Sequence, residues 1–232
     1  MTAASSGGAG DIVYAIPVMR RLGVHTIAVK RSYYQFPDKH LCQAVRRLLD
    51  CEGFTVIETS GDYPMHQFDP ELKFDINLDD FRHRPQRGSI HIMLNTALQF
   101  GLSIHDWDWR NPWLTGVIAR MDGPENIIQL TPRWRDRSRV DWKKVLQRIS
   151  GTVGFIGFEH EHADFCAKYG NVPYLPTEDL YHAAQYVKFA KRVYCNQSAI
   201  LTLAQGLGVE YWLERKPMKS NTLMKTKYEH LL

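Results

Sequence analysis

The stretch Gly7-Gly8-Ala9-Gly10-Asp11 is the first part of the sequence whose residue types could carry out chemistry. It is a glycine-rich turn that leads into an apolar helical pattern, so free backbone N–H groups would point outward at the positive end of a helix dipole. Asp11 is a candidate general base at the edge of a cleft, and a simple N-cap role is the alternative. The residues after Gly10 do not complete the dinucleotide-binding glycine fingerprint, and a Walker A lysine is absent.

Two candidate anion-binding segments lie in the second half of the chain. Asn196, Gln197 and Ser198 precede a helical pattern whose N-terminus could bind a diphosphate, although Ser198 could equally be only a cap. The run 131–139 holds four arginines, and it could grip phosphate through bidentate hydrogen bonds. A solvated charge run and a nucleic-acid contact surface are the alternatives for this second segment.

Two acidic patterns raise the question of a metal. In the run 159–162, two histidines alternate with two glutamates, a spacing that does not place the histidines on one helical face. We prefer the interpretation that a carboxylate of this run holds a ribose, because the run follows a strand pattern. Asp106 and Asp108 form a DxD pattern that could hold a divalent cation, but they lie in a Trp- and Pro-rich connector. We therefore expect no metal and no cofactor.

The elements that must position these residues alternate between strand and helix patterns, which is typical of βαβ units with parallel sheets. The expected strands are 25–29, 54–57, 74–78, 126–131, 151–157, 172–174, 191–195 and 209–213. The expected helices are 11–22, 38–51, 89–102, 140–149, 161–169, 177–189 and 198–207, and the basic tail could also be helical. The pattern breaks at residues 103–124. We predict an α/β fold with two small Rossmann-type domains, 1–118 and 119–232, that face each other across a cleft.

Composition narrows the class of protein. The 232 residues are 44% hydrophobic and 12% aromatic, which excludes a disordered chain, and no run approaches the ~18–20 apolar residues of a membrane span. The N-terminus lacks the pattern of a secretory signal. Four cysteines without a CxxC pair favour reduced thiols in a cytoplasmic protein. The net charge of +4 permits anionic ligands without requiring them.

Several segments together resemble glycosyltransferase family 9, the ADP-heptose:lipopolysaccharide heptosyltransferase group. The segment 8–22 is similar to the family's opening, in which a Gly-Asp pair is followed by a proline and an arginine. Segments 74–78 and 90–102 resemble its next strand and helix, and segments 157–161, 177–184 and 193–209 resemble later motifs. The chain departs from the family at Asn196-Gln197-Ser198, where the family has Asp-Ser-Gly, and at Leu201, where it has histidine. It is also shorter.

The resemblance implies a GT-B fold and an inverting, metal-independent transfer of a sugar from a nucleotide-diphospho-sugar. Asp11 would be the general base in the acceptor-side loop of Gly8 and Gly10. The C-terminal domain would bind the donor and the tail would cross back to the first domain. The implied donor-binding residues are Thr131, Arg133, Arg135, Gly157, Glu161, Asn196, Gln197 and Ser198.

The acceptor stays open between a glycolipid or saccharide and a hydroxymethylated base in DNA. The arginine-rich turns 82–87 and 133–139 and the tryptophans would suit DNA. A degenerate module that binds a nucleotide sugar without catalysis is a third possibility, against which the intact Asp11 argues. The sequence does not identify the sugar, the nucleotide or the oligomeric state. We also expect the glycine turn and the turn at 196–198 to face each other across one groove, because ligands of such folds bind at the carboxyl ends of the strands.

Overall fold

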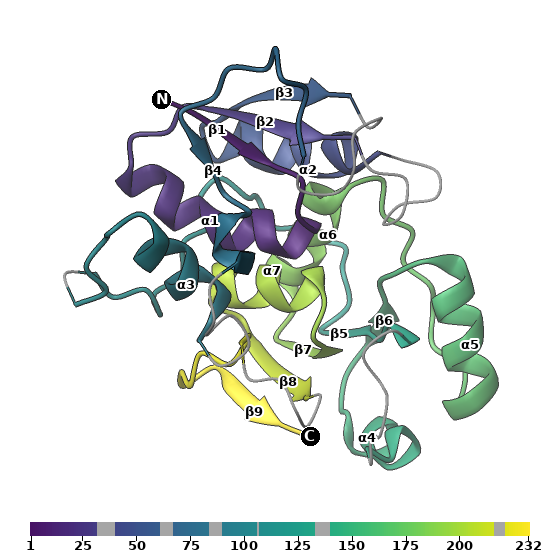
Figure 1. Cartoon of the computed structure of the whole chain (residues 1–232). Helices are drawn as coiled ribbons and strands as arrows, with labels where there is room; N and C mark the ends of the chain where they lie inside the picture. Colours follow the sequence, from purple (N-terminus) through teal and green to yellow (C-terminus); the bar gives the residue numbers. More distant parts are fainter. Residues whose placement is uncertain (32–39, 61–66, 84–89, 106, 133–139, 216–220) are drawn as a thin grey trace.

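Two parallel sheets organise the chain (Figure 1). The computed structural model describes residues 1–31, 40–60, 67–83, 90–105, 107–132, 140–215 and 221–232. The first sheet has the order β3-β2-β1-β4, and every pairing in it is parallel. Its strands are β1 (Thr2–Ser5), β2 (Thr26–Lys30), β3 (Thr55–Thr59) and β4 (Ile76–Asn77). Its helical segments are α1 (Ala9–Arg21), α2 (Leu41–Cys51), the 3-10 helix η1 (Asp80–His83) and α3 (Ile92–Gln99).

The second sheet has the order β6-β5-β7-β8-β9 and is also parallel throughout. Its strands are β5 (Asn126–Gln129), β6 (Val153–Phe155), β7 (Arg192–Asn196), β8 (Glu210–Glu214) and β9 (Glu229–Leu231). Its helices are α4 (Trp142–Arg148), α5 (Glu159–Tyr169), α6 (Leu180–Phe189) and α7 (Ala199–Leu207). The predicted α/β class with two parallel sheets is confirmed, whereas the boundary at residues 118 and 119 stays a prediction.

In the described part of the C-terminal tail, residues 221–232, the regular element is the strand β9 rather than the helix that the sequence allowed. The carbonyl oxygen of Asn221 accepts a hydrogen bond of 2.9 Å from the Ile92 N–H at the start of α3, so the tail contacts the first half of the chain there. The tail then returns to the second sheet as β9, which pairs with β8. The open edge of β8 supplies backbone hydrogen-bonding groups that an added strand satisfies.

One buried apolar cluster extends from the first sheet into the second, and a smaller cluster around Trp142 lies on the second sheet. Helix α1 packs against α7, and α2 packs against α6, as Figure 1 shows. At the α1–α7 contact, the buried Tyr14 hydroxyl donates a hydrogen bond of 2.6 Å to Oε1 of the buried Gln205. The Trp113 indole N–H donates to the Val13 carbonyl at 3.2 Å. The two halves are therefore held together by a packed interface. None of the described helices is long and apolar enough to span a bilayer.

His91 at the start of α3 gives a prediction about stability and pH. Its ring is buried beside Tyr14, and its Nδ1 accepts a hydrogen bond of 3.2 Å from the Met93 N–H. Burial lowers the pKa of His91 from 6.5 to about 3. Below pH 6.5 the unfolded chain therefore binds a proton that the folded chain does not, and stability is lost as the pH falls toward 3. Between pH 7 and pH 5 we expect this group to cost about 2 kcal/mol of unfolding free energy.

Urea unfolding at the two pH values measures this loss. His91→Asn keeps an acceptor for the Met93 N–H and should remove the contribution of His91 to the pH dependence. The exposed His105 provides the matched control, since His105→Asn should leave the wild-type slope in place. An unchanged slope in His91→Asn would mean that other groups cause the loss.

Candidate active site

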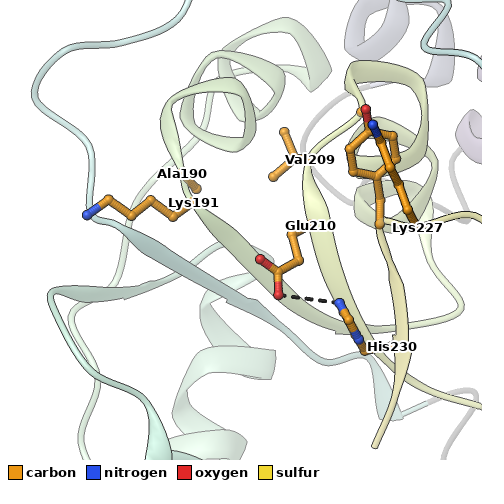
Figure 2. Close-up of a pocket in the computed structure, with 8 residues that line it drawn as sticks. Ala190, Lys191, Val209, Glu210, Lys227 and His230 are labelled. Carbon is orange, nitrogen blue, oxygen red and sulfur yellow. Dashed lines mark ion pairs between the residues drawn. The ribbon is translucent and has the colours of Figure 1, made fainter.

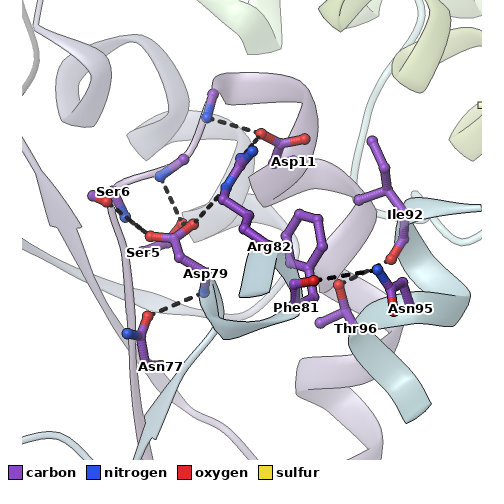
Figure 3. Close-up of polar contacts among 12 residues, drawn as sticks. Ser5, Ser6, Asp11, Asn77, Asp79, Phe81, Arg82, Ile92, Asn95 and Thr96 are labelled. Carbon is purple, nitrogen blue, oxygen red and sulfur yellow. Dashed lines mark hydrogen bonds and ion pairs between the residues drawn. The ribbon is translucent and has the colours of Figure 1, made fainter. Parts of the chain in front are cut away.

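The carboxyl edge of the first sheet carries a buried carboxylate that fixes the glycine turn (Figure 3). Asp79, which follows β4, is 1% exposed, and its Oδ2 accepts hydrogen bonds from the Ser6 N–H at 2.5 Å and the Ser6 hydroxyl at 2.9 Å. A Cβ atom on Gly7 would lie 2.8 Å from Oδ1 of Asp79, so the close approach requires glycine. Asp79 therefore sets the path of the chain from β1 into α1.

Asp11 lies in the first turn of α1, where two groups hold one of its oxygens. Its Oδ2 accepts a hydrogen bond of 3.1 Å from the Gly8 N–H and forms an ion pair with the Arg82 guanidinium. The other oxygen, Oδ1, points away from these partners in Figure 3. Gly8 occupies the N-cap position, so Asp11 stands three residues into the helix and is not itself the N-cap. The side chain is 21% exposed, which leaves it accessible to a ligand.

The start of α1 lies directly against the start of α7. A Cβ atom on Gly10 would be 3.3 Å from Oγ1 of Thr202 and 3.6 Å from Cα of Ala199. Ala199 follows the turn at residues 196–198, so the two helix starts that carry the two turns are in contact, and the facing of the turns themselves stays a prediction. The groove expected between them stays a prediction.

The carboxyl edge of the second sheet brings Thr131 and Asn196 together. The fully buried Asn196 donates from Nδ2 to the Thr131 carbonyl at 2.7 Å, and the Thr131 N–H donates to its Oδ1 at 3.3 Å. Gln197 donates to the Thr222 hydroxyl at 2.8 Å, and the Ser198 hydroxyl donates to Oε1 of Gln129 at 2.5 Å. These side chains shape the turn before α7. The Ser198 hydroxyl makes no capping bond to α7, although the residue occupies the N-cap position.

Glu161 repeats in α5 the geometry of Asp11 in α1. It is 5% exposed, and its Oε2 accepts a hydrogen bond of 3.2 Å from the Phe158 N–H at the N-cap position. Gly157 has a φ of 155°, and a Cβ atom there would lie 2.8 Å from the same oxygen. The Tyr174 hydroxyl donates to the Gly157 carbonyl at 2.9 Å, and burial raises the pKa of that hydroxyl, with added repulsion from Glu159 and Glu161. The structure thus brings Gly157 and Glu161 together at the end of β6.

Arg133, Arg135 and Asp106 lie outside the described residues. Asp108 is exposed in the connector, where its Oδ1 accepts from the Arg110 N–H at 3.2 Å. Within the described ranges, no group of three or more His, Cys, Asp or Glu side chains lies close enough to hold a metal ion.

Sequence reasoning missed Asp79 and assigned Arg82 only to a possible nucleic-acid contact. The structure instead places Asp79 against Ser6 in the turn before α1, and it places Arg82 in an ion pair with Asp11 and near Asp79. Lys30, the last residue of β2, was also missed. It is buried, its Nζ donates to the Gln67 carbonyl at 2.9 Å, and burial lowers its pKa, opposed by the charge of Asp79. Their position directly after strand patterns was the signal that could have found Asp79 and Lys30.

Two open cavities lie away from Asp11. One of about 540 Å³ opens at the amino ends of β7, β8 and β9, where Figure 2 shows Lys191, Glu210, Lys227 and His230. Another of about 480 Å³ lies beside the C-terminal end of α1 and is lined by three tryptophans, Trp107, Trp109 and Trp113. Ligands of parallel sheets bind at the carboxyl ends of the strands, which makes the region around Asp11 the stronger candidate.

Solved structures share this architecture along nearly the whole chain. E. coli ADP-heptose LPS heptosyltransferase II is 10% identical, with a TM-score of 0.63 and coverage of 100% of this chain and 89% of that one. A family 9 glycosyltransferase from Veillonella parvula is 13% identical, with a TM-score of 0.54 and coverage of 100% and 84%. The iron-containing heptosyltransferase TibC of enterotoxigenic E. coli, solved with ADP-D-beta-D-heptose, is 12% identical, with a TM-score of 0.57 and coverage of 98% and 61%.

No protein-family model matches the sequence, and no curated protein matches it. At these identities the structural likeness shows the fold. The chain therefore has the heptosyltransferase-like GT-B fold that its resemblance to glycosyltransferase family 9 implied.

Proposed function

We propose that this protein is an inverting glycosyltransferase that moves a sugar from a nucleotide-diphospho-sugar to an acceptor hydroxyl without a metal ion. One observation carries the proposal. The Asp11 carboxylate is held by a single oxygen at the start of α1, and that helix start lies against the N-terminus of α7 in a GT-B fold. These contacts support the proposal because the residue proposed as the base would then lie next to the helix start proposed to bind the departing anion.

The reaction follows from these positions. Asp11 takes the proton of the acceptor hydroxyl as its oxygen attacks the anomeric carbon from the face opposite the diphosphate. The new glycosidic bond forms while the bond to the diphosphate breaks, so the nucleoside diphosphate leaves with the electron pair and the anomeric configuration inverts. The proton later passes from Asp11 to solvent.

The negative charge of the leaving group needs stabilisation. The positive end of the α7 dipole would supply part of it, and Thr131 with Arg133 and Arg135 would supply hydrogen bonds and charge in place of a metal. Glu161 would hold the ribose of the donor next to Gly157. Asn196 and Gln197 would contribute by shaping the turn that presents the α7 N-terminus.

We propose a saccharide or glycolipid as the acceptor. The alternative of a hydroxymethylated base in DNA drew on the basic turn that begins at Arg82, whose guanidinium pairs with Asp11. The ion pair with Asp11 occupies one of the basic side chains that would otherwise contact a phosphate backbone. The four cysteines are free thiols, which fits the proposed cytoplasmic location.

A donor screen in the presence of EDTA tests the proposal. The protein is heated with ADP-, UDP-, GDP- and CMP-sugars, and we expect one nucleotide class to raise the melting temperature, because ligand binding stabilises the folded state by mass action. That donor is then incubated with a panel of oligosaccharides, and released nucleoside diphosphate is measured. Arg133→Ala and Arg135→Ala should each reduce the thermal shift.

Two results would count against this function. Absence of both a thermal shift and nucleotide release with every donor would contradict glycosyl transfer. Loss of activity in EDTA with recovery on adding Mg²⁺ or Mn²⁺ would contradict metal independence and favour the pair Asp106 and Asp108 as ligands.

A further inference from the structure

Arg82 pairs with the proposed base, and the reaction above does not use it. We propose that Arg82 is a positioning residue: it holds Asp11 by one carboxylate oxygen so that the other faces the acceptor hydroxyl. This inference rests on the proposed function, because it assigns a role within the same site.

The geometry around Arg82 carries the inference (Figure 3). Its guanidinium forms an ion pair with Oδ2 of Asp11, and its Nε lies 3.7 Å from Oδ1 of Asp79. The side chain is 27% exposed and packs over the Phe81 ring, with its Cζ 4.9 Å from the ring centre. Arg82 therefore joins a residue after β4 to a residue in the first turn of α1.

The backbone of Arg82 is itself fixed. Its N–H donates to the Asp79 carbonyl at 3.0 Å, and Asn95 of α3 donates from Nδ2 to the adjacent Phe81 carbonyl at 3.3 Å. Asp79 is in turn anchored to both donors of Ser6. A side chain attached to such a framework can restrict the rotation of the carboxylate that it holds.

Among the described residues, the two groups that bond to the Asp11 side chain contact the same oxygen. The Gly8 N–H and the Arg82 guanidinium meet Oδ2, and Oδ1 points away from them in Figure 3. A general base must present an oxygen within hydrogen-bond distance of the hydroxyl that it deprotonates, and small misplacements of catalytic groups reduce rates strongly. Fixing one oxygen from two directions keeps the other in place.

The charges around Asp11 are compatible with its proposed role as the general base. One guanidinium faces two carboxylates, so Arg82 is shared between Asp11 and Asp79 and does not neutralise Asp11 alone. Arginine suits this bridging role because its planar guanidinium donates in several directions, whereas a lysine ammonium is a single point charge.

The test uses Arg82→Gln and Arg82→Lys in the full chain, with the donor and acceptor found in the screen. We expect Arg82→Gln to lower kcat by about tenfold or more while donor Kd and acceptor KM change by less than about twofold. Arg82→Lys should retain part of the activity. Arg120→Gln is the matched control, since Arg120 pairs with Asp122 at the surface, and it should leave kcat unchanged.

A double-mutant cycle isolates the route through Asp11. If Arg82 acts by positioning that carboxylate, Arg82→Gln should cause no further loss of kcat in an Asp11→Asn background. If Arg82 instead bound the acceptor directly, its replacement would raise the acceptor KM, and that effect would add to the effect of replacing Asp11. If Arg82→Gln does not fold, as judged by circular dichroism, the same cycle is run with Arg82→Lys.

The outcomes separate this inference from the proposed function. Transfer by the wild-type chain with unchanged kcat in both Arg82 variants overturns the positioning role alone. A loss of kcat on Arg82→Gln that persists in the Asp11→Asn background also overturns it. A change confined to acceptor KM has the same consequence. Absence of transfer by the wild-type chain overturns both proposals.

Discussion

Asp11→Asn is expected to reduce turnover by about 10²-fold or more while folding and donor binding stay nearly intact. The asparagine is close in size and keeps an oxygen that can accept the hydrogen bond from the Gly8 N–H. It cannot take a proton from an acceptor hydroxyl at neutral pH. The measurements are kcat from nucleotide release, donor affinity from the thermal shift, and the melting temperature of the unliganded variant.

Asp108→Asn is the matched control for this change. Asp108 is an exposed carboxylate that also accepts a backbone hydrogen bond, and we expect its variant to keep wild-type turnover. A collapse of donor affinity in Asp11→Asn would make Asp11 a ligand contact. A large drop in melting temperature with unchanged turnover would leave it only a structural role at the helix start.

Asp79→Asn is expected to lower the free energy of unfolding by about 3 kcal/mol. The Asp79 carboxylate is almost completely buried, accepts from both donors of Ser6 and lies near Arg82. An amide at this position removes the negative charge that the guanidinium and the short backbone hydrogen bond require. Urea unfolding at neutral pH measures the loss.

Asp75→Asn controls for the loss of a carboxylate in the same region. Asp75 also accepts a backbone hydrogen bond, 2.7 Å from the Thr2 N–H, but in an exposed setting. Water can replace the lost interaction there, and we expect Asp75→Asn to lower the free energy of unfolding by less than about 1 kcal/mol. Equal losses for the two variants would show that burial of Asp79 does not matter.

The pattern of apolar residues was sufficient to predict most of the secondary structure. Strand β2 reads as a continuous apolar run because both faces of a parallel sheet are covered, and its Ile27, Ala28 and Val29 are fully buried. Helix α7 is capped by Gly208, whose φ of 69° is the left-handed conformation that glycine adopts at helix ends. Such signals are local, so they can be read along the chain.

The C-terminal tail shows that local sequence signals do not determine every element. Its residues were compatible with a helix, yet 229–231 form a strand. The choice depends on the unpaired edge of β8, which lies beside the tail only after the second sheet has formed.

The candidate site likewise has some features that are local in the sequence and others that depend on tertiary contacts. Local sequence is enough to place Asp11 in the first turn of a helix after a glycine turn, because these residues are consecutive. The tertiary structure is needed to bring Arg82 to Asp11, since the two are 71 residues apart and meet when β4 pairs with β1. It also decided that Gly10 meets Ala199, through the packing of α1 on α7. Contacts of this kind depend on which sheet edges and helix faces bury each other, and the apolar period within one segment does not specify its partner.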